Sequence, residues 1–197
     1  HLRLARLLTH PDDFHRAKLL FEISIELLPK EIDPLLSLAS FLYRGAQSSP
    51  DGTVTKIPDL MGSRKYLDKA LELDPDCPEA RYQIAKIAFD LNEYKSAKNH
   101  LNFCLNESSA KADAYFLLAE IDLLGNEEGR AITHFQKAAE SGAQKAKVYF
   151  HLSEIHLGHE DFSKAKFCCE KSIEFFQEEI AIDSKSAKFL MEQSNFY

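Results

Sequence analysis

The chain has 197 residues, of which 45% are hydrophobic and 28% charged, and its formal net charge is −7. A partner that binds through a phosphate backbone requires clustered lysine and arginine, so the acidic balance argues against nucleic acid. The sequence contains no run of 18 apolar residues, which argues against membrane insertion. It opens at His1 without a methionine, and we therefore expect a piece of a longer protein.

Residues 1–31 are expected to form two short helices, because their small and apolar residues recur at helical spacing. Pro29 marks the end of the second helix, since proline cannot continue a helix. The residues that carry the two inner faces are Leu4, Ala5, Leu8, Ala17, Phe21 and Ser24.

Residues 32–77 are expected to form a second helix pair with a long connection. Its first helix begins near Ile32, with Asp33 as the N-cap and Pro34 in the first turn. Its second helix runs over residues 64–73 and ends before Pro75. Glycines and prolines in residues 46–62 exclude a continuous helix there, so we expect a surface loop. A tolerated insertion is favoured over a binding loop.

From residue 78 onward the sequence repeats at an interval of 34 residues. Small side chains recur in three columns, as two helices require where their backbones approach closely. The columns are Ala85, Ala119 and Ser153; Ala97, Ala131 and Ala165; and Cys104, Ala138 and Ser172. A fixed period of this length is the signature of stacked helix pairs.

This pattern resembles the tetratricopeptide repeat (TPR) family, which implies an all-α, right-handed α-solenoid of helix-turn-helix units. A related helical repeat of about 36 residues competes, but the uninterrupted 34-residue spacing decides against it. Two departures from the TPR pattern are Arg81, where a bulky aromatic is typical, and the absence of the glycine at the eighth position. We expect a single array over 1–197, with repeats at about 1–31, 32–77, 78–111, 112–145 and 146–179.

Residues 180–197 have an amphipathic composition suited to covering the open face of the last repeat. Asp183 and Ser184 offer a new N-cap, so a separate C-terminal capping helix is expected there. The alternative is that this segment is the first helix of a sixth unit.

The sequence lacks the strong catalytic signatures: it has no Gly-rich phosphate loop, no HExxH and no GxSxG. We therefore expect a non-enzymatic protein without cofactor or metal. The four cysteines indicate free thiols and an intracellular location, with the cytoplasm favoured. His151, His156 and His159 are interpreted as polar residues of a helix and turn rather than metal ligands.

Asp122 and His156 occupy the same repeat position one period apart, where a large apolar residue is typical. They either face each other as a half-buried pair or each turn to solvent. The second arrangement is favoured, because equivalent positions of stacked repeats need not touch.

In the TPR family, residues of the first helix of each unit line a concave groove that holds extended or helical peptides. Carried onto this sequence, the groove is lined by Leu36, Ser40, Tyr43, Tyr82, Lys86, Phe89, Phe116, Glu120, Leu123, Phe150, Glu154 and Leu157. Of the clamp with which some members bind acidic chaperone tails, only Lys147 is present. The groove chemistry therefore indicates an apolar or basic-apolar protein segment as the partner.

Together these features predict an interaction module or scaffold that holds a partner peptide or helix, within a larger assembly. The alternative is a structural spacer or dimerisation region of a larger protein whose active domain lies elsewhere.

Overall fold

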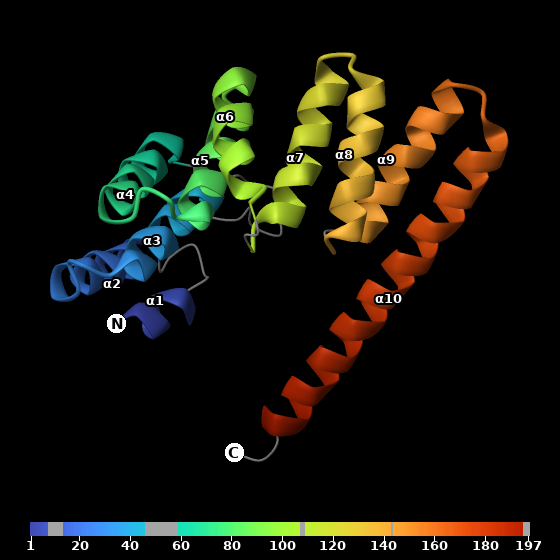
Figure 1. Ribbon diagram of the computed structural model, residues 1–197. Helices are drawn as coiled ribbons and strands as arrows, with labels where there is room; N and C mark the ends of the chain where they lie inside the picture. Colours follow the sequence, from blue (N-terminus) through green and yellow to red (C-terminus); the bar gives the residue numbers. More distant parts are fainter. Residues whose placement is uncertain (8–13, 46–58, 107–108, 143, 195–197) are drawn as a thin grey trace. The chain divides into compact units, whose positions relative to one another are not determined.

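The computed structural model describes residues 1–7, 14–45, 59–106, 109–142 and 144–194 (Figure 1). All regular secondary structure within these ranges is α-helical, which confirms the predicted fold class. The chain divides into two compact units, His1–Ala110 and Lys111–Tyr197. Leu8 and most of the expected insertion, residues 46–58, lie outside the described ranges.

The first unit contains six helices within its described residues, in the pairs that the sequence predicts. Ala5, Ala17, Phe21 and Ser24 are buried as expected, and α2 ends two residues before Pro29. The helices are α1 (Leu2–Leu7), α2 (Phe14–Leu27), α3 (Ile32–Arg44), α4 (Leu60–Leu73), α5 (Pro78–Asp90) and α6 (Tyr94–Cys104).

Two helix starts in this unit differ from the sequence prediction. Helix α4 begins at Leu60, four residues early, because the Asp59 side chain accepts a hydrogen bond from the Gly62 backbone N–H and caps the first turn. Gly62 thus belongs to the helix rather than the loop, and Leu60 packs on the core around Leu67. Helix α3 begins at Ile32, so Asp33 lies in its first turn and is not the N-cap.

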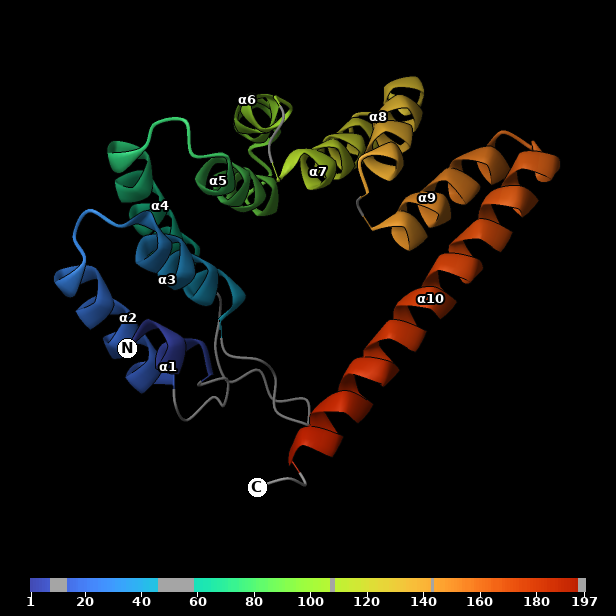
Figure 2. The same ribbon diagram turned by 60° about the horizontal axis from the view of Figure 1, so that its bottom comes forward.

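The second unit consists of two helix hairpins over its described residues: α7 (Lys111–Leu124) with α8 (Glu128–Glu140), and α9 (Lys145–Gly158) with α10 (Phe162–Ser194). Figure 2 shows α10 running on past the end of α9 as one continuous helix. The predicted break at Asp183 and the separate capping helix are therefore wrong. The reason is that residues 162–194 contain no glycine or proline, and one N-cap signal does not interrupt a helix already formed.

The three columns of small residues are all buried, as the repeat register predicts. Two residues of the third column also bond to the start of their own hairpin. The Cys104 thiol lies 3.4 Å from the Pro78 carbonyl oxygen, and the Ser172 hydroxyl donates to the Ala146 carbonyl at 2.9 Å. A small polar side chain at this position thus ties the second helix to the first.

Each of the three hairpins from α5 onward turns through a residue in the left-handed region: Asn92, Asn126 and Glu160, with φ of 61°, 57° and 57°. The N–H of the next residue then reaches back to a carbonyl five positions earlier, as from Glu93 to Ala88 at 2.7 Å. This is the Schellman arrangement, which satisfies carbonyls left free at a helix end. This turn is missing from the sequence prediction, although Asn92 and Asn126, which lie 34 residues apart, indicate it.

Candidate partner-binding surface

In the first unit, two hydrogen bonds join the first helices of successive repeats, α3 and α5. The Ser40 hydroxyl donates to Gln83 Oε1 at 2.9 Å, and the Tyr43 hydroxyl donates to Asp90 Oδ2 at 2.7 Å. These bonds hold the exposed edges of the two helices in one arrangement.

A hollow of about 330 Å³ lies between α3 and α5 and is lined by Ser40, Tyr43, Arg44, Gln83 and Lys86. The Lys86 ammonium lies 4.5 Å from the centroid of the Tyr43 ring and 6.0 Å from that of Tyr82. Both distances are within the range of cation–π attraction. Three of the predicted groove residues, Ser40, Tyr43 and Lys86, thus meet at one hollow.

A second hollow of about 490 Å³ continues along α3 and shares Ser40, Arg44 and Gln83 with the first. Its other lining residues are Phe21, Asp33, Leu36 and Ser37. The predicted groove residue Leu36 therefore borders this surface while also packing on the core cluster around Leu67. Tyr82 and Phe89 are half-buried, and the Phe89 ring contacts Tyr94 edge to face.

Burial, followed by the hydrogen bond to Asp90, raises the pKa of Tyr43 far above its ordinary value. The phenol consequently remains a neutral donor to Asp90 at any physiological pH. Sequence reasoning did not single out Asp90, Gln83 or Arg44. Their signal is spacing, since Arg44 lies one helical turn after Ser40, and Asp90 one turn after Lys86.

In the second unit the predicted groove residues divide between core and surface. The Phe116 side chain is only 8% exposed, and its ring packs against the rings of Phe135 and His151 with centroids 5.6 and 5.9 Å apart. Phe116 therefore braces the hairpins, and the expectation that it lines a groove is not met. Leu123 is half-buried against the same core cluster.

In this unit, the predicted groove residues that are exposed lie on helix α9. Phe150 is 48% exposed and Leu157 57% exposed, and Glu154 lies between them on the helix and is exposed as well. On α7, Glu120 is half-buried, and burial raises the pKa of its carboxyl, against the opposing effects of His151 and Lys147. The surface of α9 is therefore apolar with an acidic group at its centre.

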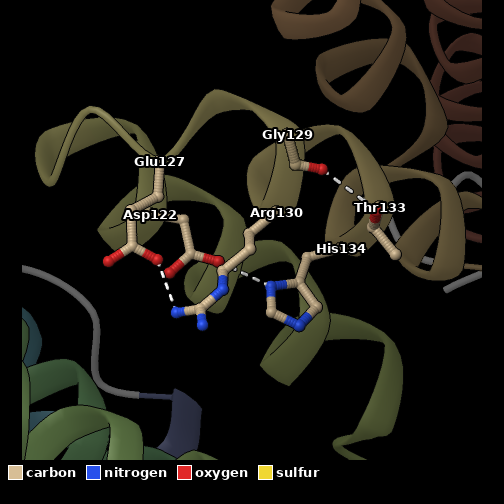
Figure 3. Close-up of polar contacts among 6 residues, drawn as sticks. All are labelled: Asp122, Glu127, Gly129, Arg130, Thr133 and His134. Carbon is tan, nitrogen blue, oxygen red and sulfur yellow. Dashed lines mark hydrogen bonds and ion pairs between the residues drawn. The ribbon is translucent and has the colours of Figure 1, made fainter.

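Asp122 departs from both arrangements considered for it. It is 1% exposed, and its Oδ2 lies 2.7 Å from Nδ1 of His134 on α8, within one hairpin (Figure 3). The same figure shows the exposed pair Arg130–Glu127 at 2.6 Å and the Thr133 hydroxyl donating to the Gly129 carbonyl. Asp122 thus pairs inside its own repeat, which satisfies a buried carboxylate as burial requires. The partner of Asp122 is therefore His134 and not His156, the partner considered from the sequence.

The histidines of α9 and its turn have separate neighbours. His151 stacks on Phe135 and lies 3.2 Å from Glu154, while His159 Nε2 lies 2.5 Å from Glu128. Within the described ranges, no three histidine, cysteine or acidic residues come together as a metal site would require. In the same ranges, no helix has the length and apolarity needed to cross a membrane.

Paired helices with buried small columns, joined by matching left-handed turns, define the class as a TPR-type helical repeat protein. Residues 21–126, more than half of the chain, match the family profile of the second ARM domain of tetratricopeptide repeat protein 21. The chain belongs to this family. Residues 146–178 match the tetratricopeptide repeat itself. A search of curated proteins finds no match.

Solved structures of similar fold include PilF of Pseudomonas aeruginosa, with a TM-score of 0.74 and 12% identity over 88% of this chain and 73% of that one. TTC0263 of Thermus thermophilus, a thermophilic TPR protein, has a TM-score of 0.65 and 15% identity, over 96% of this chain and 97% of that one. MamA of Desulfovibrio magneticus RS-1 has a TM-score of 0.64 and 20% identity, over 90% of this chain and 96% of that one. At these identities the likeness concerns the fold alone.

Proposed function

We propose that this chain is a non-enzymatic interaction module whose first-helix surfaces hold a segment of a partner protein. The observation that carries the proposal is the hollow between α3 and α5, where polar and charged side chains from two repeats line one space. Helical-repeat proteins use surfaces of this kind, built from successive units, to bind partners. The exposed face of α9, with Phe150, Glu154 and Leu157, fits a basic-apolar stretch of the same partner or of another one.

The test fills the hollow. In the variant Ser40→Trp the indole occupies the space between α3 and α5, and we expect partner proteins retained by the wild-type chain to be lost. The matched control is Lys69→Trp, at an exposed position on the second helix α4. Thermal unfolding checks that both variants remain folded.

Retention of the same partners by folded Ser40→Trp would contradict the proposal for this surface. Failure of the wild-type chain to retain any protein would favour the alternative role as a spacer or dimerisation region.

A further inference from the structure

Two cations line the hollow between α3 and α5. The described contacts of the Lys86 ammonium are with the faces of Tyr43 and Tyr82. The described contact of Arg44 is from its Nε to the Ser40 carbonyl at 3.4 Å. Among the residues that the structure describes, neither cation forms an ion pair with a carboxylate. Both therefore retain N–H donors for a ligand.

A neutral donor accompanies them. Gln83 Oε1 accepts a hydrogen bond from the Ser40 hydroxyl. The amide nitrogen of the same side chain therefore remains as a donor on the lining of the hollow. The lining thus combines an ammonium, a guanidinium and an amide, contributed by both helices. Such donors together favour a small anionic acceptor over an apolar or cationic group.

We infer that the hollow binds the carboxylate of an aspartate or glutamate side chain in the partner segment. This inference rests on the proposed function and specifies the chemistry of the partner at one point. Charge supports a carboxylate over a phosphate. The described residues that line the hollow carry two positive charges, on Lys86 and Arg44, and no negative charge. Asp90, bonded to Tyr43, and Asp33, on the adjoining hollow that shares Arg44, add negative charge nearby. This partly offset positive charge suits the single charge of a carboxylate better than a phosphoryl group, which carries about −1.5 to −2.

The expectation of an apolar or basic-apolar partner rests largely on Glu120 and Glu154, which lie in the second unit. The hollow lies in the first unit and has the opposite charge. The acidic side chain inferred here is therefore a separate requirement on the partner, fulfilled at α3 and α5.

The experiment selects 12-residue peptides from a random displayed library on the full 197-residue chain. We expect the selected peptides to be enriched in aspartate and glutamate and to lose binding in Ser40→Trp. An acidic peptide should bind Lys86→Gln about fivefold more weakly, the upper end for a solvent-accessible ion pair. The matched control is Lys69→Gln, because Lys69 also lies over a tyrosine ring, that of Tyr66 at 5.6 Å on α4. It should bind as the wild type does.

A charge reversal makes the result specific. Selection on the double variant Arg44→Glu, Lys86→Glu should enrich lysine and arginine instead. Replacing the glutamate of a selected peptide by glutamine should weaken binding, and replacing it by phosphoserine should not strengthen it.

Peptides that depend on Ser40 but show no acidic enrichment would overturn the inference and leave the proposed function intact. Tighter binding of the phosphoserine peptide would overturn the choice of a carboxylate. Selected peptides that bind Ser40→Trp unchanged would overturn both the inference and the proposed function for this hollow.

Discussion

Phe116 and Phe150 occupy the same position in successive repeats but have different surroundings. Phe116 on α7 is covered by rings from α8 and α9, whereas Phe150 on α9 is about half exposed. The same residue type can therefore serve as a brace in one repeat and as accessible apolar surface in the next.

We predict that Phe116→Ala destabilises the chain by about 3 to 5 kcal/mol, because it opens a cavity in the core cluster around Phe135. Phe150→Ala is the control and should cost under about 1 kcal/mol, since its side chain already contacts solvent. Urea unfolding of both variants measures the difference. Equal effects would mean that the burial of Phe116 contributes little.

The cysteines differ in their expected reactivity. Burial raises the pKa of the Cys104 thiol to about 11 and also raises the pKa values of Cys77 and Cys168, whereas Cys169 is exposed. A raised pKa leaves less of the reactive thiolate at pH 8. We predict that iodoacetamide modifies Cys169 first and the other three at least about tenfold more slowly. Peptide mass spectrometry follows each site, and rapid modification of Cys104 in the folded chain would contradict the packing of α6 on α5.

At the scale of the element, the hairpin turns are the feature that the repeat imposes most strictly. Asn92, Asn126 and Glu160 all adopt positive φ, but only asparagine tolerates that region well among these residue types. Glu160 therefore retains strain that the two asparagines reduce.

We predict that Glu160→Gly stabilises the chain by about 0.5 to 1 kcal/mol, since glycine adopts positive φ without steric cost. Asn126→Gly is the matched control and should gain less. The midpoint of urea unfolding reports both changes. A loss of stability in Glu160→Gly would show that the side chain makes contacts that outweigh the backbone strain.

The crossing of paired helices gives a second prediction at this scale. Ala131 on α8 is fully buried in the cluster with Ala119 and Phe135, so Ala131→Leu should overpack the crossing and cost about 1 to 3 kcal/mol. Thr133→Leu, at an exposed position of the same helix, is the control. Thermal unfolding of the two variants compares them, and an Ala131→Leu variant as stable as the wild type would be inconsistent with close helix approach there.

For the molecule as a whole, the 34-residue period was sufficient to predict the helix pairs and their small buried columns. Periodicity reports which face of a helix is buried, and it did so correctly at Ala97, Ala131 and Ala165. Periodicity does not indicate which side chain a buried polar residue pairs with. Asp122 pairs with His134, 12 positions away on α8, and no repeat spacing connects these two.

Helix ends were predicted less well, because they depend on single capping bonds. The Asp59 side chain extends α4 backward into the expected loop, and the absence of a breaker carries α10 through Asp183. Of the candidate groove residues, three line the hollow between α3 and α5. The arrangement of Ser40, Tyr43 and Lys86 around one hollow depends on the bonds between α3 and α5, which a spacing rule does not contain.

Site-specific photo-crosslinking distinguishes whether partners contact the first helices of the repeats, as proposed, or the second helices. A photoreactive benzoyl-phenylalanine is placed at Arg44 or Phe150 on first helices, and at Lys69 or Phe167 on second helices, all of them exposed positions. We expect the Arg44 and Phe150 positions to crosslink partner proteins and the Lys69 and Phe167 positions not to do so. Crosslinks confined to the second-helix positions, or equally strong at all four, would contradict the proposal.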